Sequence, residues 1–421
     1  MGSLAGQREG KVMKRFRRVP TLLVLGLVLA ACGGPAVQQP QSPVGDGVVA
    51  EAQADEAANA LPRDGFYETK PDAAAAGTLL RSERFTQWQL PEGVTGTRII
   101  YDSRSASGRP VAASAAVLTP PGPPPRDGWP VIAWAHGTSG VAARCAPTLM
   151  RDLYYPDVIS TWLKAGHAVV AADYSGLGAG SGHEYLTLAA NANDVRYSVA
   201  AARQAVAGLG ARWVAAGHSQ GGQAVWGVAR QEASEPTGKF LGSVALAPVT
   251  PYDRLQAAAA DNQGQGQYLA YVASSIALQH REFRPEDMLS AAGMRDYGQY
   301  LHGGCWPYGR AVSADGTPRQ LLRPGWSRNA AVRRFLEHNR YTTGPLAGPI
   351  FVASGATDED VPASTIATVV SEQCEQGSPV AYHEYPGTHE TVLEQSAADQ
   401  VQWVKDRFAG VPAPSTCTQP R

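Results

Sequence analysis

The sequence predicts an α/β fold with a mostly parallel central sheet, helices on both faces of the sheet and an inserted helical cap. Three observations lead to this prediction. Apolar runs of strand length alternate with segments of helical periodicity, a rhythm typical of parallel sheets. The strand pattern stops after Pro251, gives way to helical segments up to about Leu346, and returns at Pro349. A Gly-x-Ser-x-Gly motif, Gly217–Gly221, lies directly between a strand pattern and a helical pattern.

The first 31 residues read as an export signal. A basic cluster precedes the apolar run 21–31, which is too short to cross a bilayer as a helix. The run ends in Leu29-Ala30-Ala31-Cys32-Gly33, which resembles the lipobox of bacterial lipoproteins, in which the cysteine is acylated. We therefore expect residues 1–31 to be a lipoprotein signal peptide and Cys32 to be a lipid anchor. The protein is then exported and extracytoplasmic, held on the membrane of the cell envelope; a soluble secreted protein is the alternative.

Charge and cysteine content narrow the class of protein. The net charge is −1 over the chain, and removing six of the 36 basic and one of the 37 acidic residues with the signal leaves about −6. This mildly acidic chain argues against a nucleic-acid partner. Four cysteines follow the anchor, and in an oxidising compartment an even number predicts two disulfides, with three possible pairings. They are Cys145, Cys305, Cys374 and Cys417. None has the spacing of a metal site, so we expect neither a metal nor another cofactor.

Composition and pattern divide the rest of the chain into four parts. Residues 32–62 are rich in Pro, Gly and Ala and poor in aromatic residues, which predicts a flexible tether. Residues 63–254 are expected to form the first part of the core, residues 255–346 the helical cap, and residues 347–421 the second part of the core.

The elements follow in order. The core opens with an antiparallel hairpin, predicted from two alternating segments, 97–101 and 111–118. Strands are then expected at 130–136, 168–173, 212–217 and 242–247, and helices at 158–165, 189–207 and 223–231. Helices are expected in the cap at 255–260, 267–278, 287–301 and 329–338. The second part of the core should add strands at 349–355 and 380–385 and helices at 362–373 and 397–408.

Ser219 is the predicted nucleophile. A sharp turn from strand to helix forces the serine backbone into a strained conformation, and small residues must flank it two positions away on each side. Gly217 and Gly221 meet this requirement. The bare motif is weak evidence, and the strand before it and the helical pattern after it make the assignment specific. The alternative is a tight glycine turn with an inert serine.

A serine hydroxyl needs a base that is itself oriented by a third group. Asp358 lies in a loop between an apolar strand and a helix, where an orienting acid belongs, with Asp360 as the backup and helix capping as the alternative role. His389 follows Pro386-Gly387 in the loop after the last strand and is the predicted base, whereas His383 lies inside that strand. His218, beside the nucleophile, is interpreted as a packing residue.

Acyl transfer also needs hydrogen-bond donors where negative charge develops. The backbone N–H of Gln220, directly after the nucleophile, is one predicted donor of the oxyanion hole. Thr138, in the small-residue loop after the strand 130–136, is the other, with Gly137 as the alternative. A plain glycine-rich turn is the simpler interpretation of this loop.

The chain resembles the α/β-hydrolase superfamily over residues 90–410 and is more narrowly similar to the secretory lipase family. The order Ser219, Asp358, His389 is that of the α/β-hydrolase scheme. The narrower match is carried by His136-Gly137-Thr138, Cys145-Ala146-Pro147, Asp173-Tyr174-Ser175-Gly176-Leu177-Gly178, Gly217-His218-Ser219-Gln220-Gly221-Gly222 and the helical insertion. The resemblance implies an α/β-hydrolase fold, an insertion that caps an acyl pocket, and disulfides joining Cys145 to Cys305 and Cys374 to Cys417. The lipobox departs from the secreted members of the family.

These observations predict a serine carboxylic ester hydrolase, of triacylglycerol lipase or carboxylesterase type, that acts on a small-molecule or lipid ester through an acyl-serine intermediate. A peptidase or an acyltransferase on the same fold is the alternative, because the triad defines acyl transfer but not the acceptor. A non-catalytic surface-binding lipoprotein would be indicated by a lost triad residue, and none is lost. Apolar residues of the cap are candidates for lining the acyl site or for helix packing: Met288, Leu301, Trp306, Tyr308 and Trp326.

Overall fold

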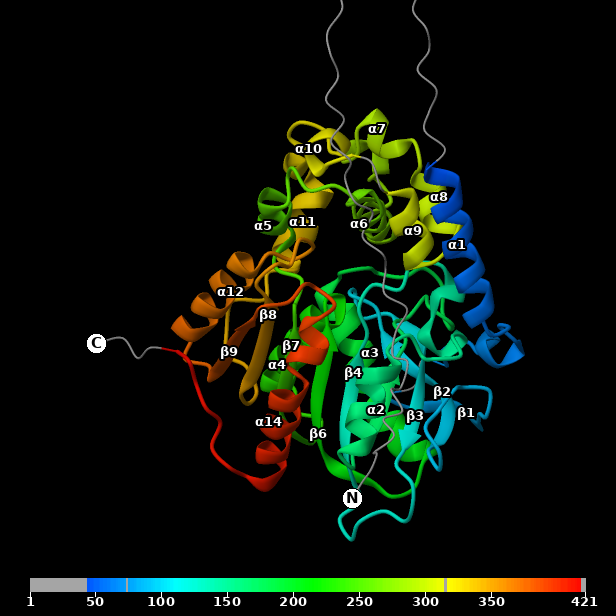
Figure 1. Ribbon diagram of the computed structural model, residues 1–421, viewed down its shortest axis with the longest axis vertical. Coiled ribbons are helices and arrows are strands. Elements are labelled where there is room, and N and C mark those ends of the chain that lie inside the picture. The colour runs from blue at the N-terminus through cyan, green and yellow to red at the C-terminus, as the bar shows by residue number, and fades with distance from the viewer. Residues whose placement is uncertain (1–43, 73–74, 314–315, 418–421) are drawn as a thin grey trace, which may run out of the picture. The chain divides into compact units, whose positions relative to one another are not determined.

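The computed structural model describes residues 44–72, 75–313 and 316–417 (Figure 1). The predicted signal peptide, Cys32 and the first part of the predicted tether lie outside these residues. No helix within the described ranges is long and apolar enough to cross a membrane.

The described residues form one nine-stranded sheet with the order β1-β2-β3-β5-β4-β6-β7-β8-β9. The strands are β1 (Leu79–Arg84), β2 (Thr95–Arg104), β3 (Pro110–Thr119), β4 (Trp129–Ala135), β5 (Ala168–Ala172), β6 (Leu209–His218), β7 (Lys239–Leu246), β8 (Ile350–Gly355) and β9 (Val380–Tyr385). Strands β1, β2 and β3 pair in antiparallel fashion, and β3 also pairs antiparallel with β5. The other six strands, β5, β4, β6, β7, β8 and β9 in sheet order, run parallel to one another. The predicted hairpin is therefore β2 and β3, and β1 is an edge strand that the sequence did not predict.

Helices cover both faces of the sheet because alternate residues of the central strands are apolar on both sides. In β6, Trp213 and Ala215 pack into one buried cluster, whereas Val214 and Ala216 pack into the other. The first cluster is completed by α3 (Leu188–Ala205), α4 (Gln220–Ser234) and α12 (Ala363–Glu375), and the second by α2 (Pro156–Lys164) and α14 (Ala397–Ala409). The predicted α/β architecture is confirmed.

The insertion between β7 and β8 is helical and gathers at the top of Figure 1. Its helices are α5 (Tyr252–Ala258), α6 (Gly266–Gln279), α7 (Ala291–Met294), α8 (Tyr297–His302), α9 (Trp306–Val312), α10 (Pro318–Leu321) and α11 (Ala330–His338). The prediction of one helix over 287–301 is wrong. The Ser290 side chain accepts the N–H of Gly293 and caps the start of a separate helix, α7. Short 3-10 helices are η1 (Gly65–Glu68), η2 (Ala143–Cys145), η3 (Pro147–Leu149), η4 (Pro285–Asp287) and η5 (Trp326–Arg328), and α13 (Val392–Gln395) precedes α14.

Residues 44–62 are not the flexible tether that the composition predicted. Residues 44–59 form α1 (Val44–Asn59), which packs against α9 (Figure 1). The Glu56 carboxylate accepts the N–H groups of Cys305 at 2.9 Å and Tyr308 at 3.0 Å. Asn59 donates to Asp152 at 2.8 Å. Composition does not reveal α1, because this helix gains its stability from contacts with the cap and the core and has few large apolar side chains of its own.

Two disulfides join distant parts of the described chain. Cys145 in η2 pairs with Cys305 directly before α9, and this bond ties the core to the cap. Cys374 in α12 pairs with Cys417 in the C-terminal segment. The structure therefore has the pairing that the family resemblance implies.

Candidate active site

Ser219 lies in the turn between β6 and α4 and has a positive φ of 55° with a ψ of −115°. For a residue other than glycine this conformation costs about 1–3 kcal/mol, so the surroundings must hold it. The Ser219 N–H donates to the carbonyl oxygen of Leu246 at 2.9 Å, and its own carbonyl oxygen accepts from Val249 at 3.1 Å. Strand β7 and the segment after it thus hold the turn in place.

The two glycines of the motif are required by close backbone contacts. A Cβ atom at Gly221 would overlap the carbonyl oxygen of Ala135, and one at Gly217 would overlap the carbonyl group of Gly221. Only glycine lets β4, β6 and α4 approach this closely. The spacing that predicted the nucleophile turn therefore has a steric cause in the fold.

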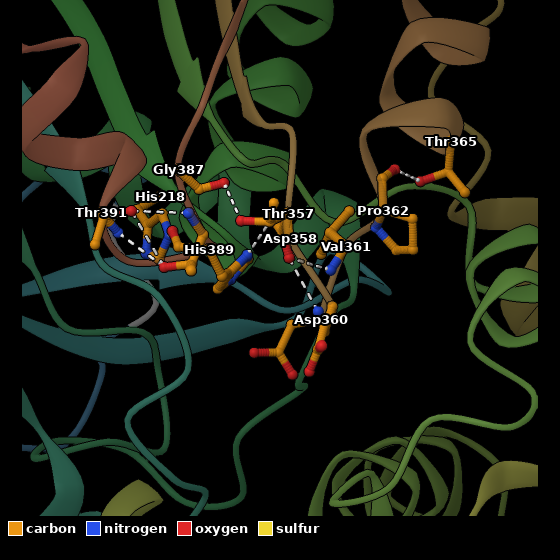
Figure 2. A network of polar contacts seen from close by, with 12 residues as sticks. His218, Thr357, Asp358, Asp360, Val361, Pro362, Thr365, Gly387, His389 and Thr391 are labelled. Carbon is orange, nitrogen blue, oxygen red and sulfur yellow. Dashed lines mark hydrogen bonds and ion pairs between the residues drawn. The ribbon is translucent and has the colours of Figure 1, made fainter. Parts of the chain in front are cut away.

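Asp358 and His389 meet at the carboxyl ends of β8 and β9 (Figure 2). The Nδ1 atom of His389 lies 2.7 Å from Oδ2 of Asp358. The other carboxylate oxygen of Asp358 accepts the N–H groups of Asp360 at 2.9 Å and Val361 at 2.7 Å. Asp358 thus shapes its own loop with one oxygen and orients the imidazole with the other, which leaves Nε2 of His389 as the ring nitrogen available to a substrate or nucleophile.

The alternatives considered for the acid and the base lie elsewhere. Asp360 accepts from Gln265 at 3.3 Å and pairs with Arg310 at 3.4 Å, so it belongs to the contact between the core and the cap. His383 stacks on Phe351 with ring centroids 5.4 Å apart, on β9. Within the described residues, neither side chain forms a hydrogen bond or an ion pair with Asp358 or His389.

Electrostatics favour a protonated His389 beside the carboxylate. Burial by itself disfavours the imidazolium, but the charge of Asp358 and the hydrogen bond to it outweigh burial, with help from Asp360 and Glu390. Together they raise the pKa of His389 to about 9. The pair is therefore suited to accept a proton and to stabilise the resulting cation.

A cavity of about 200 Å³ brings together three of the predicted site residues, Thr138, Ser219 and His389. Its lining consists of Thr138, Tyr154, Tyr155, His218, Ser219, Tyr268, Trp306, His389, Glu390 and Leu393. Of the apolar cap residues considered from the sequence, Trp306 lines this cavity, with Nε1 donating to the Tyr268 hydroxyl at 2.9 Å. The others pack between helices: Met288, Leu301 and Tyr308 are buried, and Trp326 contacts Tyr252.

The candidate oxyanion donors come from the start of α4 and from the loop after β4. Gln220 is the first residue of α4, so its N–H has no carbonyl partner inside the helix. The N–H of Gly137 donates to the Tyr155 hydroxyl at 3.2 Å. That bond occupies the alternative donor, whereas Thr138 lines the cavity.

Sequence reasoning missed part of the cavity wall. Tyr154, Tyr155 and Tyr268 carry no motif, and Glu390 and Leu393 follow the base without a distinctive pattern. His218 was interpreted as a packing residue and is buried, yet its ring also lines the cavity and contacts His389 with centroids 4.6 Å apart. Its position beside Ser219 was the one available signal.

A serine with a positive φ between a strand and a helix, at the carboxyl edge of a parallel sheet, defines an α/β-hydrolase fold. The chain belongs to the secretory lipase family, whose sequence pattern matches residues 153–416. Family membership and the two disulfides support a carboxylic ester hydrolase of an extracytoplasmic compartment.

Solved structures share the fold at low sequence identity. Candida antarctica lipase A in its closed state is 19% identical with a TM-score of 0.71, and the match covers 86% of this chain and 90% of that chain. A ligand-bound form of the rice cell wall degrading esterase LipA from Xanthomonas oryzae is 18% identical with a TM-score of 0.68, over 80% of this chain and 100% of that one. A comparison with curated proteins finds no match.

Proposed function

We propose that the protein hydrolyses carboxylic esters through an acyl-serine intermediate on Ser219. The observation that carries this proposal is that Ser219, in its strained turn, and His389, bonded to Asp358 at 2.7 Å, line one cavity. His389 accepts the Ser219 proton through Nε2 as the hydroxyl oxygen attacks the ester carbonyl. Asp358 keeps the proton on Nδ1 and stabilises the imidazolium.

The reaction then proceeds in two acyl transfers. The N–H groups of Gln220 and Thr138 bind the oxyanion of the tetrahedral intermediate, and His389 returns its proton to the leaving alcohol oxygen as the C–O bond breaks. A water molecule, deprotonated by His389, attacks the acyl-enzyme. Release of the carboxylic acid restores Ser219.

The walls of the cavity support an apolar acyl group of limited length. Aromatic side chains and Leu393 supply an apolar surface on several sides. The volume of about 200 Å³ is below the roughly 300–1,000 Å³ of common ligand pockets, and this favours short acyl chains over long ones. A small-molecule or lipid ester with a short acyl group is therefore the substrate class that we propose.

The test is hydrolysis of p-nitrophenyl esters from acetate to palmitate by the purified protein, beside Ser219→Ala. We expect turnover to be highest for the short esters and to vanish in the variant. Equal rates in both proteins, or no turnover of any ester, would contradict the proposal and favour a peptidase, an acyltransferase or a binding protein.

We also propose export and membrane anchoring through residues 1–31 and Cys32, which rest on the sequence pattern alone. Lipid anchoring predicts that the protein fractionates with membranes. Cys32→Ala should release it, and a variant that stays in the membrane fraction would contradict the anchor.

A further inference from the structure

Four tyrosine hydroxyls converge on the loop that contains Thr138. Tyr174 donates to the carbonyl oxygen of His136 at 2.8 Å, and Tyr154 donates to that of Thr138 at 2.7 Å. Tyr155 accepts the N–H of Gly137 at 3.2 Å, and Tyr185 lies 2.8 Å from the Thr138 side-chain hydroxyl. Within the described ranges the N–H of Thr138 has no acceptor. The four hydroxyls therefore bind groups on both sides of the Thr138 N–H, the donor that the oxyanion hole needs, and none of them binds that N–H.

Two of these tyrosines reach the loop from a strained turn. Leu153 and Tyr154 have φ of 57° and 68°, in the left-handed region that residues with a side chain rarely adopt. Each costs about 1–2 kcal/mol, so a compensating contact is required. Leu153 is buried, and the hydroxyls of Tyr154 and Tyr155 bind the carbonyl oxygen of Thr138 and the N–H of Gly137. The strained turn thus aims two neighbouring hydroxyls at one loop.

The Tyr155 hydroxyl also contacts His218, which extends the network to the base. Nδ1 of His218 lies 2.9 Å from the Tyr155 hydroxyl, and Nε2 lies 2.9 Å from the carbonyl oxygen of His389. A carbonyl oxygen only accepts, so Nε2 of His218 carries hydrogen. Burial, and then the charge of His389, hold the pKa of His218 well below 6.5, so the ring is neutral and Nδ1 accepts from Tyr155.

These hydrogen bonds form one chain in which each group accepts from the residue before it and donates to the residue after it. The N–H of Gly137 donates to Tyr155, Tyr155 donates to His218, and His218 donates to the backbone of His389. The loop of the oxyanion donor and the loop of the base are thereby joined behind the nucleophile. A shift of either loop breaks a buried hydrogen bond, which is unfavourable in a region of low dielectric constant.

We propose that Tyr154, Tyr155 and His218 are positioning residues that keep the oxyanion donor Thr138 and the base His389 correctly placed relative to Ser219. Tyr154 binds the carbonyl oxygen of Thr138, and Tyr155 and His218 form one chain of hydrogen bonds from Gly137 to His389. The proposal rests on the proposed ester hydrolysis. It adds residues of the cavity wall that act through the loops of Thr138 and His389.

The test compares Tyr154→Phe, Tyr155→Phe and His218→Phe with Tyr101→Phe. Tyr101 is a matched control because it also loses a buried hydroxyl that donates to a backbone carbonyl at 2.7 Å, that of Asp194, and it does not line the cavity. We expect each site variant to lose about tenfold to a hundredfold in kcat at nearly unchanged KM, since a misplaced donor costs up to about a hundredfold. His218→Gln, which keeps a donor for His389, should recover part of the loss.

Two further readouts separate positioning from loss of structure. Affinity for an alkyl trifluoromethyl ketone, which forms a hemiketal oxyanion on Ser219, should fall in proportion to kcat/KM in Tyr154→Phe and Tyr155→Phe. The double variant of Tyr155 and His218 should cost little more than the larger single loss, because the two residues share one chain. The melting temperature of each variant, compared with that of Tyr101→Phe, reports on folding.

Site variants that keep kcat/KM within threefold of the wild type, while Ser219→Ala abolishes turnover, would overturn the positioning network and leave the ester hydrolase standing. If the wild type hydrolyses none of the esters, the rate at which a fluorophosphonate labels Ser219 provides the same comparison, because it depends on the same base and oxyanion donors. A wild type that neither turns over esters nor is labelled overturns both proposals.

Discussion

Removal of the Asp358 carboxylate by Asp358→Asn should be the most damaging change short of losing the nucleophile or the base. The carboxylate lies 2.7 Å from Nδ1 of His389 and contributes most to raising the pKa of that histidine from 6.5 to about 9 against the effect of burial. At about 1.4 kcal/mol per pKa unit, this difference corresponds to about 3 kcal/mol in favour of the imidazolium. The imidazolium is the state that forms when His389 takes the Ser219 proton.

The expected loss of rate follows from this energy. About 3 kcal/mol corresponds to two to three powers of ten in kcat, and an asparagine that stabilises the wrong tautomer can extend the loss to about 10⁴-fold. The assay is kcat for a short p-nitrophenyl ester from pH 5 to pH 10. In the variant, burial dominates, so the pKa of His389 should fall and the residual activity should be flat across neutral pH.

Asp360→Asn is the matched control for this prediction. It removes a carboxylate two residues away that pairs with Arg310 and Gln265. We expect it to keep kcat within about threefold of the wild type and to shift the pH profile slightly. An Asp358→Asn protein that retains kcat within tenfold, or an equal loss in Asp360→Asn, would refute the assignment of the orienting acid.

Two further predictions concern the charge near the base and the N-terminal helix. The neutral imidazole is the active form, so kcat/KM should rise with pH through the pKa of His389, about 9. Glu390→Gln removes a negative charge that favours the imidazolium and should move this limb to lower pH, whereas Glu394→Gln, an exposed neighbour, should not; an unmoved limb in the first variant would contradict the reasoning. Glu56→Gln weakens the cap on α9 by about 1 kcal/mol and should lower the melting temperature by a few degrees relative to Glu51→Gln, and equal melting temperatures would contradict the role of α1.

The sheet and the nucleophile turn could be predicted because their signals are local. Strand β6 is an apolar run, and the close backbone contact at residue 221 requires a glycine, which the sequence shows directly. The loops of Asp358 and His389 follow their own strands, so each could be placed at the carboxyl edge of the sheet without knowledge of the other. In these cases the residue that carries the chemistry lies next to the pattern that predicts it.

The tyrosines and α1 could not be predicted because their roles depend on partners far away in the chain. Tyr155 is hydrogen-bonded to His218, 63 residues later in the chain. Glu56 is hydrogen-bonded to the N–H of Cys305, 249 residues later. Composition predicted a tether for α1 because it measures what a segment can bury by itself. It carries no information on backbone N–H groups that a distant helix leaves without a partner.

Trp306 illustrates how these distant contacts converge on the cavity. The backbone N–H of Trp306 donates to the carbonyl oxygen of Ser139 at 2.8 Å. The preceding residue, Cys305, forms a disulfide with Cys145 and donates its backbone N–H to Glu56. The core, the disulfide and α1 therefore all fix the start of α9, and with it the indole that lines the cavity. An apolar residue in a predicted cap is an ordinary observation, and the contacts with Ser139, Cys145 and Glu56 make this one part of the site. A change in α1 that leaves the triad intact should consequently alter KM for the acyl group before it alters the chemistry at Ser219.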